Sequence, residues 1–233
     1  MKTHGKKYRE VQKKVEERPY QLEEALILLK EMVVTKFDPS CEIHLNLNVD
    51  PKKADQLVRG TVVLPYGTGK KIKVIVFTEE NPKTFLEVGA LKAGGEDLIA
   101  EVEKGFLDFD VAVAEPPMMK KIAKLAKVLG PKGLMPSPKA NTVTDKPLEA
   151  LKELLAGRVE FKTDPTAIIH SIFGKASFEK EKLLENLKVF LKAIVSARPS
   201  GIKGTYIMNM TICTTMGPGI RLENKVLGEL GRE

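Results

Sequence analysis

The sequence predicts an α/β protein of two domains, in which a Rossmann-like βαβ domain is inserted into a terminal α+β domain. The chain has 233 residues, enough for two ordinary hydrophobic cores. Strand patterns that alternate apolar and polar residues lie near both chain ends, whereas two continuously apolar strands lie between them. We therefore expect residues 1–66 and 158–233 to form one discontinuous domain around an inserted domain of residues 67–157.

An amphipathic helix and two strands are expected in the first segment. The apolar residues of "YQLEEALILLKEMV" recur at helical spacing and form one stripe: Leu22, Ala25, Leu26, Leu29, Met32 and Val33. In "EIHLNLNV" the period changes to two, which predicts a strand with one buried and one wet face. The buried set is Ile43, Leu45, Leu47 and Val49, and the wet set is Glu42, His44, Asn46 and Asn48. "VDPKKADQLVRG" then predicts a turn and a short helical piece, and "TVVLP" a second strand.

The middle of the chain has the pattern of a βαβ unit. "IKVIVF" and "FDVAVAE" are nearly continuous apolar runs, typical of strands that are covered on both faces. Four helical segments separate and follow them: "PKTFLEVGALKAG", "EDLIAEVEKGF", "PMMKKIAKLAKVLG" and "PLEALKELLAG". The last two are expected to stop at Gly130 and Gly157, because glycine often terminates a helix.

Alternating strands return in the last third. "RVEFKTD" and "AIIHSIFG" are expected to pair around the turn "TDPT", and Ser177 is expected to cap the following helix. That helix carries a stripe of apolar residues: Leu183, Leu184, Leu187, Phe190, Leu191, Ile194 and Val195. The final strand, "TYIMNMTICTT", is expected to place one set of side chains together: Tyr206, Met208, Met210 and Ile212. The opposite face would hold Asn209, Thr211 and Thr215.

The net charge of +7 is concentrated in two segments. Residues 1–18 contain seven Lys and Arg against three Glu, and residues 117–146 contain seven Lys against one Asp. Such basic segments favour a polyanionic partner, because neutralising phosphates releases counterions. A solvated lysine-rich surface is the alternative. With no apolar run long enough for a membrane span and no secretory signal, we expect a cytoplasmic protein without a membrane partner.

No catalytic, cofactor-binding or metal-binding site is predicted. His4, His44 and His170 lack ligand-type spacing, and Cys41 and Cys213 form no CxxC pair, so buried reduced thiols are expected. "GTGKK" is not a phosphate loop, because Leu64 stands where its first glycine belongs; a flexible linker is preferred. The alternative of a nucleotide-dependent transferase needs a glycine turn after the first middle strand, and "FTEENPKTF" has none.

Two loops are candidates for contact with nucleic acid. In "TTMGPG", Gly217, Pro218 and Gly219 predict a tight turn with Pro second and Gly third. The threonine hydroxyls could meet a ribose hydroxyl or phosphate, and Met216 could give an apolar contact. A purely structural turn is the alternative. The loop "LGPKGLMPSPKANTVT" suits a nucleic-acid backbone about as well as it suits a structural crossover.

Five separated motifs resemble the family of bacterial large-subunit ribosomal protein one: "KFDPS", "VDPKKADQLVRGTVVLPYGTGK", "VLGPKGLMPSPKANTVT", "GRVEFKTDPTAIIHSIFGKASF" and "TTMGPG". They occur in order and span nearly the whole chain. The resemblance implies the two-domain fold above and a non-enzymatic protein, a monomer when free, that binds the ribosomal RNA stalk helices mainly through its terminal domain. It also implies assisted release of deacylated transfer RNA from the exit site, and repression of translation through binding to its own operon messenger RNA.

By this resemblance, the RNA-contacting residues are Lys36, Phe37, Ser40, Glu42, Asp164, Thr166, Asn209, Thr215, Met216, Gly217 and Pro218. Three positions depart from the family pattern. Pro165 stands where Lys is usual, which removes a positive charge and an amide donor from "TDPT". Asn209 replaces the usual Ser but can still donate and accept hydrogen bonds. Asn141 stands where the family favours Gly, which can alter that loop.

Overall fold

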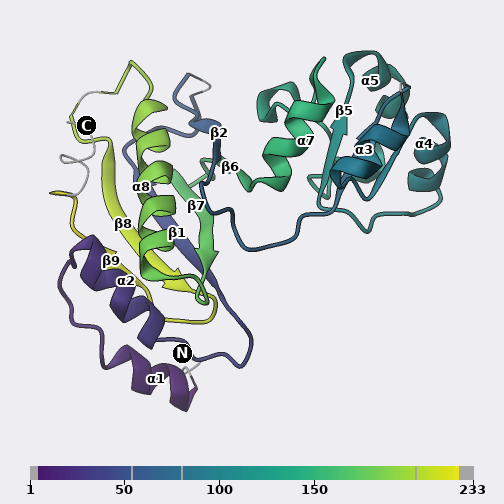
Figure 1. The fold of residues 1–233 in the computed structure, drawn as a ribbon. Helices are drawn as coiled ribbons and strands as arrows, with labels where there is room; N and C mark the ends of the chain where they lie inside the picture. Colours follow the sequence, from purple (N-terminus) through teal and green to yellow (C-terminus); the bar gives the residue numbers. More distant parts are fainter. Residues whose placement is uncertain (1–4, 54, 80, 203, 226–233) are drawn as a thin grey trace. The chain divides into compact units, whose positions relative to one another are not determined.

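The computed structural model describes residues 5–53, 55–79, 81–202 and 204–225, and the chain divides into two compact units (Figure 1). Unit 1 is formed by Met1–Gly69 together with Val159–Glu233, and unit 2 by Lys70–Arg158. Both units combine helices with strands, which confirms the predicted α/β class.

Unit 1 is built on a four-stranded antiparallel sheet in the order β7-β1-β8-β9. Its strands are β1 (Ser40–Leu47), β7 (Ile168–Lys175), β8 (Ile207–Thr214) and β9 (Ile220–Leu222). Two helices, α2 (Leu22–Glu31) and α8 (Lys180–Ser196), lie along one face of this sheet (Figure 1). Their apolar stripes share a single core with Ile43 and Leu45 of β1, so the opposite face of β1 carries its polar residues. The predicted alternation of β1 and the predicted stripe of α2 are confirmed within these bounds, but Met32 and Val33 follow the end of α2 and Val49 follows the end of β1.

A two-stranded sheet of β2 (Arg59–Val63) and β6 (Arg158–Lys162) completes unit 1. The expected pairing of β6 with β7 is limited to their connecting turn, where Thr163 and Ile169 form an isolated bridge. The reason is that the Thr163 amide donates to the Val58 carbonyl oxygen, at 3.0 Å, which keeps β6 beside β2. The segment before β2 is made of turns without a helix among its described residues, contrary to expectation.

Strand β8 departs from the predicted alternation because its register shifts. Asn46 of β1 lies opposite Asn209, but the next residue, Leu47, lies opposite Ile207. Met208 is therefore left between two paired residues and is 47% exposed, whereas Ile207 is buried. The expectation that Met208 shares a buried face with Met210 is wrong, and this irregularity is the cause.

Ser177 does not cap α8. The residue at the N-cap of α8 is Glu179, and the backbone amide and hydroxyl of Ser177 instead donate to the two Asp38 carboxylate oxygens, at 3.0 and 2.8 Å. This pair of bonds links the start of α8 to the segment that leads into β1.

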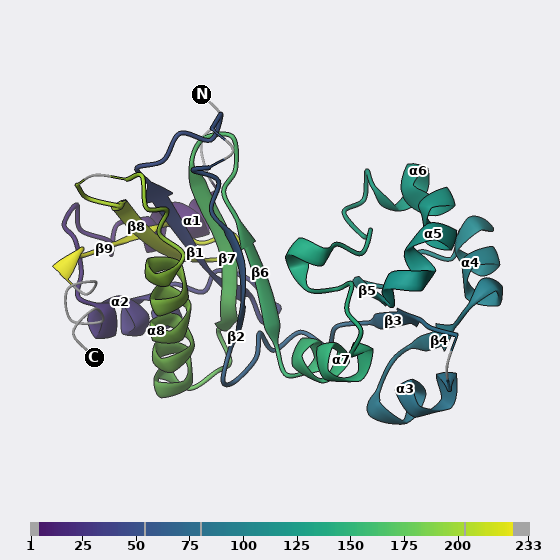
Figure 2. The ribbon, with the colours of Figure 1, turned by 90° about the horizontal axis from the view of Figure 1, so that it is seen from above.

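Unit 2 has a parallel sheet in the order β4-β3-β5, with both faces covered (Figure 2). Its strands are β3 (Val74–Phe77), β4 (Lys92–Gly94) and β5 (Val111–Ala114). Ile75 and Phe77 pack in one core with α4 (Glu96–Glu103) and α5 (Met119–Ile122). Val74 and Val76 pack in another with α3 (Pro82–Val88) and α7 (Pro147–Leu155). The predicted doubly covered strands are confirmed.

Two predicted helices of unit 2 are interrupted. "PKTFLEVGALKAG" is helical only as far as Val88, because Gly89 adopts a left-handed conformation with φ 119° and the chain turns into β4. "PMMKKIAKLAKVLG" is divided by 3₁₀ turns into α5 and α6 (Ala126–Leu129). Helix α6 ends at Leu129 with Gly130 as its C-cap, as expected, although Gly130 keeps right-handed backbone angles, with φ −58°, instead of the left-handed conformation that usually terminates a helix. Gly157 after α7 has a positive φ of 101°, so it terminates that helix as expected.

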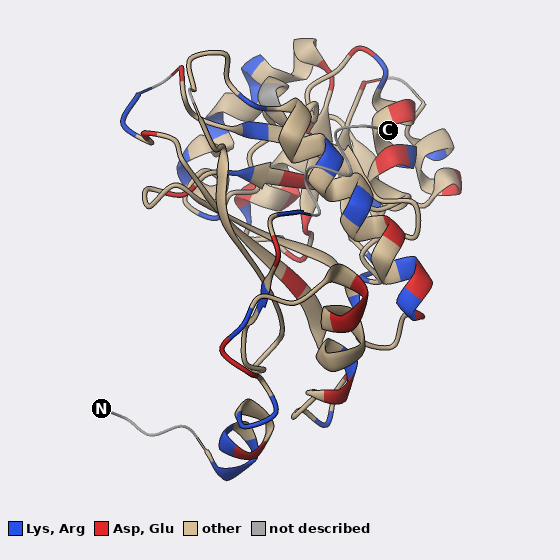
Figure 3. Ribbon diagram, turned by 90° about the vertical axis from the view of Figure 1, so that its left-hand side faces the viewer, with Lys and Arg blue, Asp and Glu red and all other residues tan. Residues whose placement is uncertain are grey.

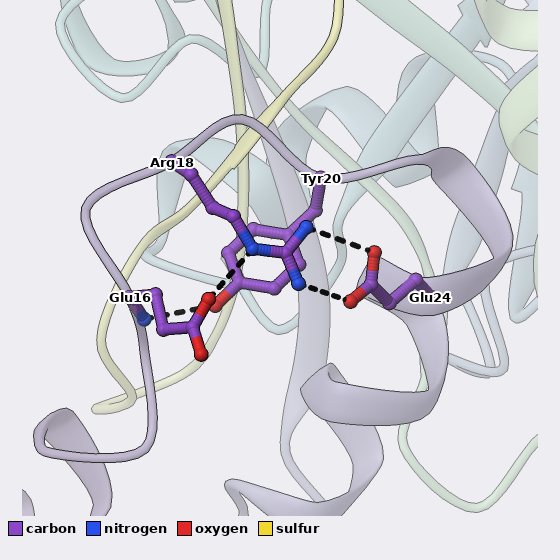
Figure 4. Close-up of polar contacts among 4 residues, drawn as sticks. All are labelled: Glu16, Arg18, Tyr20 and Glu24. Carbon is purple, nitrogen blue, oxygen red and sulfur yellow. Dashed lines mark hydrogen bonds and ion pairs between the residues drawn. The ribbon is translucent and has the colours of Figure 1, made fainter.

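The N-terminal segment contains α1 (Lys6–Gln12), which the sequence pattern did not predict, and is tied to α2 by Arg18 (Figure 4). The Arg18 side chain donates to Glu16, at 2.7 Å, and to both carboxylate oxygens of Glu24 in the first turn of α2. Its guanidinium lies 4.3 Å from the centre of the Tyr20 ring. The backbone amide of Tyr20 donates to Arg221 of β9, which joins this segment to the sheet.

We expect Asn186→Ala to destabilise unit 1 by about 3 kcal/mol, because it removes three hydrogen bonds to the backbone, one of them buried and two half-buried. Asn186 is fully buried on α8; its amide group donates to the carbonyl oxygens of Gly67 and Phe173 and accepts from the Tyr66 amide. Urea unfolding of the full chain measures the change. Asn48→Ala is the matched control, since exposed Asn48 makes one side-chain bond, to Thr205, and should cost less than about 1 kcal/mol. Equal costs for the two variants would contradict this account.

Candidate nucleic-acid interface

The polar face of the β7-β1-β8 sheet brings together side chains from three strands. On β1, Glu42, His44 and Asn46 point away from the core, in agreement with the sequence pattern. The register places His44 opposite His170 of β7 and Thr211 of β8. It also places Glu42 opposite Cys213, and Asn46 opposite Asn209. We call this surface the polar face and define it by Glu42, His44, Asn46, His170, Asn209, Thr211 and Cys213.

Thr215 joins the end of β8 to the start of β1. Its amide donates to the Ser40 carbonyl oxygen at 3.0 Å, and its Oγ1 accepts from the Ser40 amide at 3.2 Å. The same Oγ1 lies 3.2 Å from Glu42 Oε1, to which it can donate. Lys175 Nζ donates to Ser40 Oγ at 3.0 Å. These bonds bring three of the predicted RNA-contacting residues, Ser40, Glu42 and Thr215, into one cluster.

The turn after β8 lies earlier in the chain than the sequence predicts. It spans Thr214–Gly217, closed by a bond of 2.7 Å from the Gly217 amide to the Thr214 carbonyl oxygen. Its third residue, Met216, is left-handed with φ 67° and is 71% exposed. The expected turn centred on Pro218 and Gly219 is wrong, since Gly219 has no positive φ.

Gly217 and Pro218 support this turn without forming its tip. A Cβ at Gly217 would clash with the Thr214 hydroxyl, so glycine is needed for close approach. Pro218 is buried behind the turn. Of the predicted contact residues in this stretch, Thr215 and Met216 therefore present side chains outward.

Lys36 and Phe37 lie in the exposed bend before β1, at the same end of the sheet as Ser40. Phe37 is 59% exposed, and its carbonyl oxygen accepts a bond of 2.9 Å from the Thr35 hydroxyl. Asp38, held by Ser177, anchors the end of this bend. A positive charge and an aromatic ring are thus available beside the Thr215 cluster.

Asp164 and Thr166 lie at the other end of the polar face, in the turn before β7. Asp164 Oδ1 accepts from the Ile168 amide and from the Thr166 amide, each at 2.8 Å, and the Thr166 hydroxyl adds a further bond. The backbone bond from Ile168 is the main cause that lowers the pKa of Asp164 to about 2, with the Thr166 side chain next. Pro165 is exposed at the second position of this turn, where proline is favoured.

Three residues that the sequence did not predict as site residues connect the two ends. His170 Nε2 lies 3.6 Å from Asp164 Oδ2, and His170 Nδ1 lies 2.7 Å from His44 Nδ1. His44 Nε2 lies 3.2 Å from Cys213 Sγ. Alternation in the sequence placed His44 on the wet face, but only strand pairing shows that His170 and Cys213 are its neighbours.

Burial is the main cause that sets the protonation states of His44 and Cys213. It lowers the pKa of His44, and the neighbouring His170 lowers it further. Burial, followed by the charge of Glu42, raises the pKa of Cys213 to about 11. At neutral pH the centre of the polar face therefore holds a neutral imidazole and a neutral thiol. Asn209, opposite Asn46, extends the face toward a hollow that Arg221 and Asn224 also line.

Cys41 and Cys213 are both free, and Cys41 is fully buried while Cys213 is only half-buried. Cys41 lies opposite Thr214 and Glu42 opposite Cys213, so neighbouring positions on β1 place the two sulfurs on opposite faces. Both thiols are free, as expected, but the expectation that both are buried is wrong for Cys213, which the polar face leaves half-buried. His4, the remaining histidine, lies outside the described residues.

Unit 2 presents acids where a nucleotide phosphate would bind in a Rossmann-like domain. The crevice at the carboxyl ends of its strands is lined by residues that include Glu79, Glu96 and Asp97. Lys121 of α5 is paired with both Glu79 and Glu96, at 2.7 and 2.8 Å. Such a crevice repels phosphate, which disfavours the transferase alternative.

The N-terminal basic segment and the long loop lie in different units. In unit 1, Lys and Arg gather along α1 (Figure 3). In the loop of residues 129–144, the Thr142 carbonyl oxygen accepts from Ala114 of β5, and Asn141 is left-handed with φ 51°. Asparagine tolerates that conformation better than most residues, so Asn141 can serve in place of the glycine of the family pattern. The bond to β5 gives this loop a structural role.

Among the helices of the described residues, none is long and apolar enough to span a bilayer.

Sequence comparisons agree with the resemblance found in the motifs. The sequence model of the "Ribosomal protein L1p/L10e family" matches residues 29–218. The chain is 47% identical over 230 residues to a protein of Thermosipho melanesiensis, covering 97% of this chain and 99% of that one. It is 46% identical over 221 residues to one of Solibacter usitatus, covering 94% and 93%. A protein of Lactobacillus delbrueckii subsp. bulgaricus is 48% identical over 225 residues, covering 96% and 97%. All three relatives are named large ribosomal subunit protein uL1.

We expect Met216→Gly to leave stability unchanged or to raise it by about 0.5 kcal/mol. A left-handed non-glycine residue costs roughly 1–2 kcal/mol, which exceeds the extra backbone entropy that glycine loses on folding. Met208→Gly is the matched control, because Met208 is also an exposed methionine but lies within β8 without a positive φ. It should destabilise by about 0.5–1 kcal/mol. Urea unfolding compares the two, and a larger loss for Met216→Gly would show that the turn is not strained.

We expect the stability difference between the wild type and Asp164→Asn to shrink as the pH falls from 5 to 3. The folded pKa of Asp164, about 2, lies below its unfolded value of about 3.9, so its contribution is present above pH 4 and is lost as the pH falls toward 2. Urea unfolding of both proteins at the two pH values tests this. A difference that is the same at both would mean that the hydrogen bonds to Asp164 do not favour its charged form.

Proposed function

Because the chain belongs to the ribosomal protein L1p/L10e family, we propose that it is a structural, non-enzymatic protein of the large ribosomal subunit that binds ribosomal RNA directly. The observation that carries this proposal, beyond family membership, is the set of polar groups held in place around Thr215. RNA is recognised by shape and through its ribose hydroxyls, and such contacts need donors and acceptors in fixed positions.

We infer that recognition is centred on the Thr215 cluster. The Thr215 hydroxyl accepts from the Ser40 amide and bonds to the Glu42 carboxylate. Lys175 donates to the Ser40 hydroxyl, so each of these groups has a partner that sets its orientation before RNA arrives. Met216 is held outward by the left-handed turn and offers an adaptable apolar contact to a sugar or base. Preorganised groups lose little entropy on binding, so this cluster can discriminate between RNA shapes.

The remaining predicted contact residues extend this surface at its two ends. Lys36 and Phe37 add a charge and a ring for stacking beside Ser40. Asp164, Thr166 and Asn209 lie at the Asn46 end, and His170 and His44 join the two ends. We propose that the ribosomal RNA stalk helices lie along the polar face. The terminal domain would thus be the RNA-binding part and the inserted domain a separate element.

Two finer functions and a location are proposed from the family resemblance. The functions are assisted release of deacylated transfer RNA from the exit site and repression of translation from the protein's own operon messenger RNA. The location is the cytoplasm, on the large subunit. A messenger that folds like the ribosomal target could use the same preorganised cluster, so one surface suffices for both RNAs. The free protein is proposed to be a monomer.

Two variants are expected to separate shape recognition from electrostatic attraction. Thr215→Val should weaken binding to a ribosomal RNA stalk fragment about tenfold at every salt concentration, because it removes hydrogen bonds but no charge. Lys36→Gln should lower the slope of log K against log salt by about 0.7–0.9, as expected for one lost phosphate contact. Filter binding of the full-length chain across a salt series measures both.

Thr84→Val is the matched control, since Thr84 is an exposed threonine of unit 2. It should bind like the wild type. A change in slope for Thr215→Val, or an equal loss for Thr84→Val, would contradict the proposal that the Thr215 cluster recognises the RNA.

A further inference from the structure

The polar face contains a set of metal-ligand atoms that the spacing of residues along the chain does not reveal. One carboxylate oxygen of Glu42, one ring nitrogen of His44 and Cys213 Sγ all lie within 4.8 Å of one another. All three side chains are half-buried. Glu42 and His44 are two residues apart on β1, and Cys213 of β8 lies opposite Glu42. The antiparallel register, not a sequence motif, therefore creates the group.

The distances fit a tetrahedral site for a small cation. Bonds of about 2.0–2.3 Å from zinc to nitrogen, oxygen and sulfur place neighbouring ligand atoms roughly 3.5 Å apart. His44 Nε2 and Cys213 Sγ are already 3.2 Å apart. Glu42 is held near this pair by its contact with the Thr215 hydroxyl, at 3.2 Å. Small rotations of the side chains would suffice to place all three atoms around one ion.

The neighbours of His44 also suit metal binding. A histidine that binds a metal usually donates its other ring N–H to a second group, which sets its orientation. His44 Nδ1 lies 2.7 Å from His170 Nδ1, and His170 Nε2 lies 3.6 Å from Asp164 Oδ2. If His170 carries its proton on Nε2, toward Asp164, its Nδ1 can accept from His44 Nδ1–H. The His44 Nε2 atom then carries a lone pair on the side of Cys213.

We propose that Glu42, His44 and Cys213 bind a thiophilic divalent cation of the zinc class, with solvent in the fourth position. A thiol and an imidazole select borderline-soft ions over Mg²⁺ and Ca²⁺, which prefer oxygen ligands. On binding, the Cys213 S–H bond breaks, an S–metal bond forms and the proton is released to water. The divalent charge is then balanced by one thiolate and one carboxylate, so the occupied site is neutral.

The Thr215 cluster and this site share Glu42. A bound cation would draw the Glu42 carboxylate from the Thr215 hydroxyl toward Cys213, so metal and RNA would compete for the same side chain. The metal proposal itself does not require that the polar face binds RNA.

The test is titration of the metal-free, reduced full-length chain with Zn²⁺ against a competing chelator, together with the absorption spectrum of its Co²⁺ form. All proteins carry His4→Ala, so that the histidine outside the described residues cannot contribute. We expect one Zn²⁺ per chain and a near-ultraviolet band from thiolate-to-cobalt charge transfer. Cys213→Ser should abolish the band and lower the affinity more than about 100-fold, and His44→Gln should lower it at least about tenfold.

Cys41→Ala is the matched control, because Cys41 lies on the opposite face of β1 and should bind as the wild type does. His170→Asn should weaken binding about 10–100-fold while the charge-transfer band remains, as expected for a positioning residue. Circular dichroism verifies that each variant is folded.

Equal Zn²⁺ affinities for the His4→Ala parent with and without Cys213→Ser, or loss of the band in Cys41→Ala alone, would overturn the proposal. No RNA is present in this experiment. Its failure would therefore leave the proposed ribosomal function untouched, and a failure of RNA binding would leave the metal site untouched.

Discussion

The register of β1 between β7 and β8 is the constraint on which the rest of unit 1 depends. Side chains in a strand alternate between two faces, so a shift by one residue would exchange Glu42, His44 and Asn46 for Ile43 and Leu45. The core under α2 and α8 prevents this shift, because it would place apolar residues in water and carboxylate and imidazole groups in the core. The hydrophobic core thus determines which polar side chains meet on the opposite face.

Local departures from regular structure then shape the two ends of that face. At one end, the left-handed Met216 turns the chain so that Thr215 lies against Ser40. At the Asn46 end, the register shift in β8 pushes Met208 outward. At that same end, Asp164 accepts from the amides of its own turn and contacts His170. The Thr215 end is tied to β1 by hydrogen bonds to Ser40 and Glu42, whereas the Asp164 turn is closed by bonds from its own residues.

The sequence predicted an element correctly wherever a single hydrophobic periodicity determined its structure. The alternation of β1, the stripe of α2 and the doubly covered strands β3 and β5 are such cases. The sequence pattern did not predict the structure where local hydrogen bonds and close contacts determined the path of the chain. The turn after β8 is set by the Gly217 amide and the small space beside Thr214, not by the Gly-Pro-Gly pattern, and the helix before β4 is ended by Gly89. The neighbours His44, His170 and Cys213 come from three strands, and no spacing rule within one chain segment relates them.

The proposed recognition of RNA by the polar face and the turn at its end is tested most directly by hydroxyl-radical footprinting of the full-length chain, free and bound to a ribosomal RNA stalk fragment. Methionine and phenylalanine side chains report their own exposure, and Met216 and Phe37 are 71% and 59% exposed in the free chain. This account predicts that RNA protects Met216 and Phe37 from oxidation while exposed Leu86 of unit 2 keeps its reactivity. Protection confined to residues 70–158, with Met216 as reactive as before, would contradict it.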